Sequence, residues 1–192
     1  MACKAALNEA DGEMERARDI LRAKGLASAQ KRSGRQTKEG LVDAYIHTGG
    51  GMGVLLEVNC ETDFVARTDQ FKSLVHDLAI QVAGGAPRWV SREEIPASEL
   101  AREKAVFREQ AEREGKSAER LDQIVEGRLR KFYEQSCLYD QAWLRDEGSK
   151  GRSVSQVIQE VIAATGENIA VSRFVRFELG KGMTDEGQRD DA

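Results

Sequence analysis

The feature that most constrains the fold is a glycine triplet, residues 49–51, between two segments in which apolar and polar residues alternate. The segments span residues 41–47 and 53–60, and a period of two is typical of strands with one buried face. Glycine adopts the positive φ angles of tight turns at little cost. The pattern predicts a β-hairpin whose second strand buries Val54, Leu56, Val58 and Cys60.

The sequence after the hairpin is mostly helical in pattern. Apolar residues recur at helical spacing in residues 69–85, a stretch that ends in two glycines. Two further helices are expected at residues 98–114 and 118–135, and the Gly115 turn between them predicts an antiparallel helical hairpin. A capping-box pattern at Ser153 precedes a short apolar helix.

Residues 169–179 alternate again and predict a half-buried strand that buries Ile169, Val171, Val175, Phe177 and Leu179 and joins the hairpin. Two consecutive strands, several helices and a returning strand are typical of an α+β fold. We expect a mainly antiparallel three-stranded sheet with helices packed on one side and a helical hairpin. A small helical N-terminal domain precedes this core.

The N-terminal 25 residues predict two short helices, with Asp11 as an N-cap and Gly25 as the end of the second. Residues 24–38 then carry five positive charges in a polar, small-residue stretch that has the character of a linker. A solvated face is the favoured interpretation of these charges. An RNA- or ribosome-binding surface is the alternative.

The charge and the cysteines narrow the class of protein. The chain of 192 residues has a net charge of −4, which argues against a dedicated nucleic-acid binder and favours a protein partner. No apolar run suggests a membrane span or a secretion signal, so we expect a cytoplasmic protein. Three widely spaced cysteines indicate reduced thiols, and Cys60 is expected to fill the core.

Sequence signatures of catalysis are missing. The chain has no phosphate-binding loop, zinc-helix or nucleophile-elbow motif, and residues 49–53 are better explained as a hairpin turn than as a phosphate cradle. His47 and Cys60 could imitate a thiol–imidazole pair, but Cys60 is predicted to face the core and no third group is evident. We expect neither enzyme activity nor a cofactor or metal.

The segment NCETDFVAR, residues 59–67, stands out between the second strand and the strongest helix. It places an acid, an aromatic ring and a β-branched residue in a connection, where backbone usually faces solvent. In one interpretation Phe64 and Val65 cap the core while Thr62 or Asp63 caps a helical turn. In the other, these side chains bind a partner.

This segment resembles the most recognisable motif of the elongation factor Ts family. CKAALNEADGEMERARDILRAKG, EGRLRKF and GENIAVSRFVRFELG are also similar to that family, so the resemblance covers nearly everything from Cys3 to Gly180. It implies a guanine-nucleotide exchange factor that acts by binding to GDP-bound elongation factor Tu in protein synthesis. It also implies that Thr62, Asp63, Phe64 and Val65 form the loop that intrudes near the Mg²⁺ and phosphate site of that GTPase.

The chain departs from the family pattern in three places. The family's usual first helix and the TGAGMMD-like turn before CKAAL have no counterpart, and Ala142 and Trp143 stand where Pro and Phe are usual. One copy of the core is present, whereas longer members of the family carry two related halves. The short form implies a homodimer that binds two GTPase molecules, with residues 169–179 near the dimer contact. The expected domains are a partial N-terminal helical (UBA-like) domain, 1–25, a basic linker, 26–39, an α+β core, 40–180, and a disordered tail, 181–192.

Overall fold

The computed structural model describes residues 2–146 and 151–181, except for the side chain of Leu26. The chain divides into two compact units, and the division cuts across all three strands of the sheet. The first unit comprises Met1–Ala44, Leu55–Ala79 and Gln156–Arg173. The second comprises Tyr45–Val54, Ile80–Ser155 and Phe174–Ala192.

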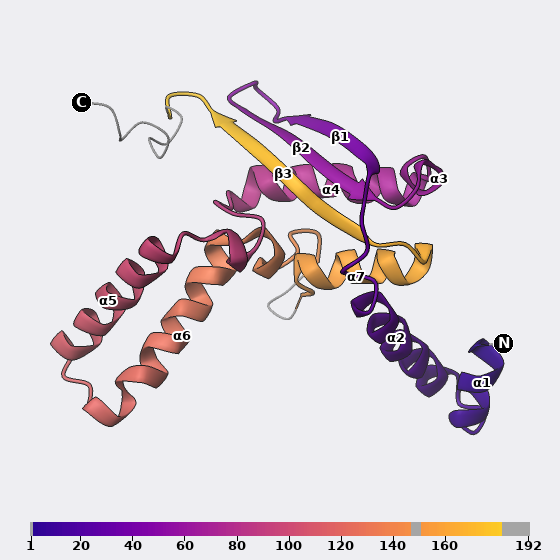
Figure 1. The fold of residues 1–192 in the computed structure, drawn as a ribbon, viewed down its shortest axis with the longest axis horizontal. Coiled ribbons are helices and arrows are strands. Elements are labelled where there is room, and N and C mark those ends of the chain that lie inside the picture. The colour runs from indigo at the N-terminus through magenta and orange to yellow at the C-terminus, as the bar shows by residue number, and fades with distance from the viewer. Residues whose placement is uncertain (1, 147–150, 182–192) are drawn as a thin grey trace. The chain divides into compact units, whose positions relative to one another are not determined.

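Helices and strands follow one another in the order shown in Figure 1. The strands are β1 (Glu39–Ile46), β2 (Met52–Cys60) and β3 (Ile169–Glu178). The α-helices are α1 (Ala2–Glu9), α2 (Met14–Gln30), α3 (Asp63–Ala66), α4 (Asp69–Gly85), α5 (Ala97–Arg113), α6 (Ala118–Ser136) and α7 (Val154–Thr165). Two short 3₁₀ turns, η1 (Arg92–Glu94) and η2 (Leu138–Asp140), complete the set.

The sheet is antiparallel, with the strand order β1-β2-β3. Gly49 and Gly50 take φ angles of 92° and 72° in the turn between β1 and β2, as the hairpin prediction requires. The predicted alternation in β2 is confirmed, because Val54, Leu56, Val58 and Cys60 are all buried. The α+β fold class and the three-stranded sheet are therefore as predicted.

The helix α4 supplies the main apolar stripe. Its bounds match the predicted helix, and its predicted inward positions are all buried: Phe71, Leu74, Val75, Leu78, Ala79 and Val82. Polar contacts in each unit tie α4 to the strands. His76 Nδ1 lies 3.2 Å from Asp43 Oδ2 of β1, and Arg176 Nε of β3 donates to the Ala83 carbonyl at 3.1 Å. Figure 1 shows α4 extended along one face of the sheet.

The N-terminal helices differ from the prediction. α2 does not end at Gly25 but continues to Gln30, and it begins after Glu13 without a side-chain cap, while Asp11 has a φ of 52° in the preceding turn. A Cβ at Gly25 would lie 3.3 Å from Ala163 Cβ of α7. This glycine therefore serves close packing between two helices, which overrides its tendency to end one.

The end of β3 also differs from the prediction. Ile169 and Val171 are buried as expected, but Val175, Phe177 and Leu179 have exposed fractions of 40%, 58% and 86%. Arg173 pairs with Glu57, whose neighbours in β2 face the core, and Arg176 points to α4. The inward positions thus shift from odd to even residue numbers within the strand. This shift turns three apolar side chains outward.

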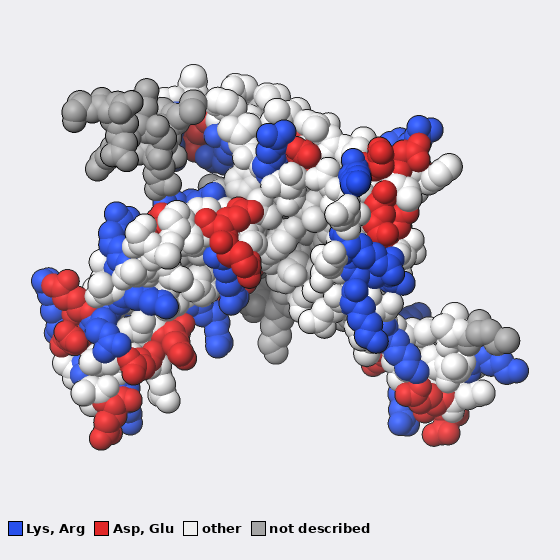
Figure 2. Space-filling model, in the orientation of Figure 1, with Lys and Arg blue, Asp and Glu red and all other residues white. Residues whose placement is uncertain are grey.

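The predicted helical hairpin is confirmed in α5 and α6, which lie side by side in Figure 1. Leu121, Val125 and Leu129 of α6 are buried. Arg128 reaches Glu114 Oε1 at 2.7 Å across the hairpin. Figure 2 shows positive and negative side chains interspersed over it. Residues 182–192, which make up most of the predicted tail, lie outside the described residues.

Candidate functional site

The NCETDFVAR segment forms the corner between β2 and α4. Thr62 leaves the strand in an extended conformation, with φ −130° and ψ 156°, and caps the single helical turn α3. Its Oγ1 accepts a hydrogen bond from the Val65 N–H at 3.5 Å. A threonine in this position satisfies an amide group that a short helix leaves without a partner.

Phe64 and Val65 have opposite environments on this turn. Phe64 is 78% exposed, whereas Val65 is 9% exposed and the following Ala66 is buried as well. Each of the two interpretations of the segment therefore describes part of it. Val65 belongs to the core, Thr62 is the cap, and the ring of Phe64 is available to a partner.

Asp63 stands at the beginning of α3 and remains partly accessible, with 45% of its side chain exposed. Its Oδ2 lies 2.8 Å from Arg67 Nη2, one helical turn further along, and Arg67 is itself largely exposed. A carboxylate at the first turn of a helix is stabilised by the amide groups there. The corner thus presents an acid, a base and an aromatic ring to solvent.

Hydrogen bonds to the carboxylates of Glu167 and Glu61 hold the corner in place. Glu167, between α7 and β3, accepts from the Thr62 N–H at 3.0 Å through Oε2 and from the Thr62 hydroxyl at 2.6 Å through Oε1. In the opposite direction, Glu61 Oε1 accepts from the Asn168 N–H at 2.6 Å. Glu61 and Thr62 of the corner are therefore hydrogen-bonded to Asn168 and Glu167, respectively.

Asn168 extends this network to the segment after α2. Its buried side-chain amide donates to the Arg35 carbonyl at 2.8 Å and to the Ser33 carbonyl at 3.3 Å. Glu61, Glu167 and Asn168 were not among the residues predicted from the sequence to form the site. One feature of the sequence could have indicated them: Glu167 and Asn168 are two polar residues directly between Gly166, which ends a helix, and an apolar strand.

Cys60 fills the core beneath the corner, as predicted. It is fully buried, its thiol donates to the Thr62 carbonyl at 3.1 Å, and burial raises its pKa above the ordinary value. A thiol with a raised pKa is a poor nucleophile at neutral pH. His47, the other member of the pair considered above, has its Nδ1 2.9 Å from the Tyr45 hydroxyl.

The basic stretch is partly neutralised within the chain. Lys24 pairs with Glu9 at 2.5 Å and Arg35 lies 3.5 Å from Glu61. Figure 2 shows the Lys and Arg side chains that gather around the C-terminal part of α2 and the segment that follows it. These intramolecular pairs are consistent with a solvated face.

Residues 2–146 and 151–181 contain no group of three or more His, Cys, Asp or Glu side chains placed to hold a metal ion. No helix in the same ranges has the length and apolar character that crossing a membrane requires.

The fold is a small α+β core, and the turn that Thr62 caps presents the side chains of Asp63 and Phe64 to solvent. Residues 28–181 match the family model described as "Elongation factor TS". The chain is 53% identical to elongation factor Ts of Moorella thermoacetica and to that of Thermotoga maritima, and 52% identical to that of Thermoanaerobacter pseudethanolicus. Each alignment covers 95% of this chain and 88–89% of the relative.

The chain therefore belongs to the elongation factor Ts family. Membership indicates a role in translation elongation.

Proposed function

We propose that this protein is a guanine-nucleotide exchange factor for elongation factor Tu, which acts in the cytoplasm by binding and without catalytic chemistry of its own. It accelerates GDP release by disturbing the Mg²⁺ and phosphate site of the GTPase. The observation that carries the proposal is the exposed Phe64 ring beside Asp63, on a turn fixed to the core by Val65. The partner-binding loop comprises Thr62, Asp63, Phe64 and Val65: Asp63 and Phe64 are the side chains that reach the GTPase, while Thr62 caps the turn and Val65 anchors it in the core.

The energetics require several contacts to act together. Exchange needs only that factor and nucleotide weaken each other's binding to the GTPase, which is a reciprocal coupling. A thousandfold loss of nucleotide affinity corresponds to about 4 kcal/mol. Complete burial of a ring such as Phe64 contributes roughly 1.5–3 kcal/mol. The remainder must come from other contacts, among them Asp63.

Asp63 supplies the electrostatic part of the mechanism. A carboxylate brought close to a metal–phosphate site changes the charge balance around the cation and competes with the phosphate oxygens for it. In the free protein this carboxylate is paired with Arg67 but stays accessible. The helices α1 and α2, which resemble the later part of the family's N-terminal helical domain, provide further contact with the GTPase.

A stopped-flow measurement of labelled GDP leaving elongation factor Tu tests the proposal. The wild-type chain should accelerate release, and Phe64→Ala and Asp63→Ala should each reduce the acceleration. Val106→Ala is the matched control, since it truncates a partly exposed apolar side chain on α5, away from the corner in sequence. Release that the wild-type chain leaves unaccelerated, together with strongly salt-dependent RNA binding, would instead favour the RNA-associated alternative.

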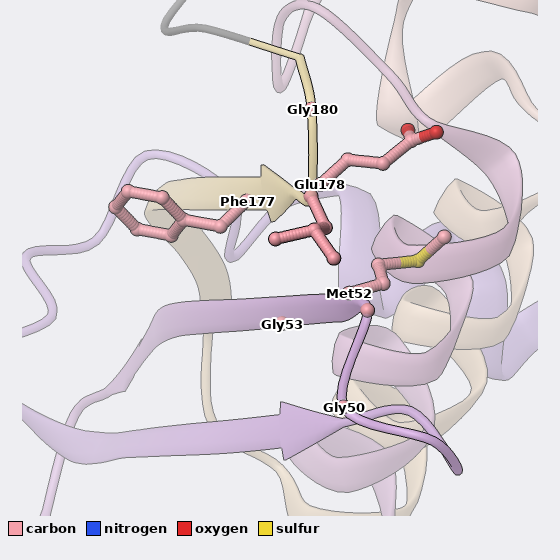
Figure 3. Close-up of a pocket in the computed structure, with 8 residues that line it drawn as sticks. Gly50, Met52, Gly53, Phe177, Glu178 and Gly180 are labelled. Carbon is pink, nitrogen blue, oxygen red and sulfur yellow. The ribbon is translucent and has the colours of Figure 1, made fainter.

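We also propose that the protein is a homodimer that binds two GTPase molecules, with β3 near the dimer contact. β3 is an edge strand of the sheet formed by the described residues, and edge strands offer unpaired backbone groups to another chain. Phe177 of this strand and Leu179, which directly follows it, are exposed and line an open hollow of about 330 Å³ together with Met52 and the glycines of the turn. Figure 3 shows the Phe177 ring projecting from the end of β3, away from Met52.

Sedimentation at micromolar concentration tests the dimer. The wild-type chain should sediment as a dimer, and Phe177→Asp should shift it toward the monomer because a buried, unpaired carboxylate is costly. Val106→Asp adds the same charge on α5 and should leave the dimer intact. A wild-type chain that sediments as a monomer would contradict this part of the proposal.

A further inference from the structure

We propose that Glu167, together with Asn168, is a positioning residue for the partner-binding loop of Thr62, Asp63, Phe64 and Val65: it fixes the direction in which α3 presents Phe64. The inference rests on the proposed function of the loop and names the residues on which that function depends. Neither residue needs to touch the GTPase. Both act by holding the segment that does.

The contact geometry supports this role. The two oxygens of the Glu167 carboxylate bind the two donors of one residue, the N–H and the hydroxyl of Thr62, at 3.0 and 2.6 Å. A backbone bond fixes the orientation of the peptide group, and a hydroxyl bond fixes the side-chain rotamer. Since the same hydroxyl oxygen accepts from the Val65 N–H, the carboxylate also sets the first turn of α3.

The loop cannot supply this order by itself. α3 is a single turn of four residues, and isolated helices of that length are unstable in water. Its outer side chains, Asp63 and Phe64, are accessible and give little packing. Two residues therefore fix the position of α3. Val65 packs into the core below the turn, and Glu167, 105 positions from Thr62 in sequence, binds Thr62 at the start of the turn.

The contact between Glu61 and Asn168 connects the corner to the segment that follows α2. Glu61 accepts from the Asn168 N–H, while the Asn168 side chain donates to the Ser33 and Arg35 carbonyls. Asn168 is buried, so its amide group would be costly to leave without partners. Asn168 thus holds both Glu61 of the corner and the segment that follows α2.

The experiment compares Glu167→Ala, Glu167→Gln and Glu99→Ala in the full-length chain. Glu99 is the matched control, because its carboxylate is similarly shielded and pairs with Arg88 at 2.6 Å in the second unit. Three quantities are measured: the GDP release rate from elongation factor Tu at saturating factor, the melting temperature, and amide hydrogen exchange in residues 62–67. The last readout requires no partner.

We expect Glu167→Ala to lower the saturating release rate about tenfold, which corresponds to about 1.4 kcal/mol, and to speed amide exchange in residues 62–67. Glu167→Gln keeps an acceptor oxygen and should fall between it and wild type. Glu99→Ala should leave both the rate and the exchange of residues 62–67 unchanged, whatever its melting temperature.

The outcomes separate this inference from the proposed function. If wild type accelerates GDP release and Glu167→Ala does so equally well, the positioning role is overturned and the proposed function stands. If wild type does not accelerate release, the proposed function fails. In that case, unchanged amide exchange in Glu167→Ala would also overturn the inference that Glu167 holds the corner in place. Faster exchange confined to residues 62–67 would support that inference.

Discussion

Phe64 and Val65 are adjacent in the chain and opposite in exposure, at 78% and 9%. Successive side chains on a helix point about 100° apart, so one turn can send one residue into the core and its neighbour outward. Here the buried valine anchors the turn that presents the phenyl ring. Solvent exposure and core packing are thereby divided between two neighbouring residues.

This division predicts opposite effects of two alanine substitutions. Phe64→Ala should change the unfolding free energy by less than about 0.5 kcal/mol, because an exposed ring contributes little to stability. Val65→Ala should lower it by about 2 kcal/mol through lost burial and a residual cavity. Urea unfolding monitored by circular dichroism measures both. Equal destabilisation by the two variants would show that the ring packs against its own chain.

The ion pair between Asp63 and Arg67 predicts a second contrast. Because the pair is exposed, Asp63→Ala and Arg67→Ala should each change the unfolding free energy by less than about 1 kcal/mol. In stopped-flow GDP release, Asp63→Ala should be slower than wild type, whereas Arg67→Ala retains the carboxylate and should not be. If both variants are slow to the same degree, the pair as a whole acts on the GTPase.

Much of the fold follows from local periodicity. The alternation of Val54, Leu56 and Val58 and the apolar stripe of α4 predicted both elements because one buried face repeats in each. The errors fall where tertiary packing overrides a local preference. Gly25 lies inside α2 because α7 packs closely against it, and the outward turn of Phe177 depends on a shift of the inward positions within β3.

The site was only partly predictable for a similar reason. The motif located the corner, and Thr62 was one of the two candidate caps, but its composition could not decide which of Phe64 and Val65 faces the core. The contact between Glu167 and Thr62 could not be predicted, since the two residues approach each other only when β3 pairs with β2. A contact of this kind depends on the sheet topology, which a periodic pattern does not specify.

Asp146 makes the free energy of unfolding depend on pH in the acidic range. Hydrogen bonds from the Arg152 side chain and backbone lower the pKa of this carboxyl group to about 2. A carboxyl group whose pKa is lower in the folded than in the unfolded state stabilises the fold above the unfolded pKa, and the contribution disappears as pH falls through the folded one. Asp146→Asn should therefore be less stable than wild type at pH 7.

The difference between Asp146→Asn and wild type should shrink as the pH falls from about 4, the ordinary aspartate value, toward 2. Thermal melts at intervals across that range measure it. A difference that stays constant down to pH 2 would contradict the assigned ion pair.

Two glycines predict opposite responses to the same substitution. Gly127 lies in the middle of α6 with an ordinary helical backbone, and a Cβ there would meet nothing within 4 Å. Gly127→Ala should raise the unfolding free energy by about 0.5–1 kcal/mol, since alanine loses less backbone entropy on folding. Gly40 of β1 has a φ of 151°, and a Cβ there would lie 2.1 Å from the Val58 carbonyl oxygen of β2.

A contact that short cannot be relieved by a side-chain rotation, because the opposing atom is backbone. Gly40→Ala must displace β1 from β2 and should lower the unfolding free energy by more than about 1 kcal/mol. Urea unfolding of the two variants in parallel measures the contrast. Since β2 leads directly into the corner at Thr62, Gly40→Ala should also speed amide exchange in residues 62–67, whereas Gly127→Ala should leave that exchange at the wild-type rate. Equal exchange in both variants would show that the corner is held without β1.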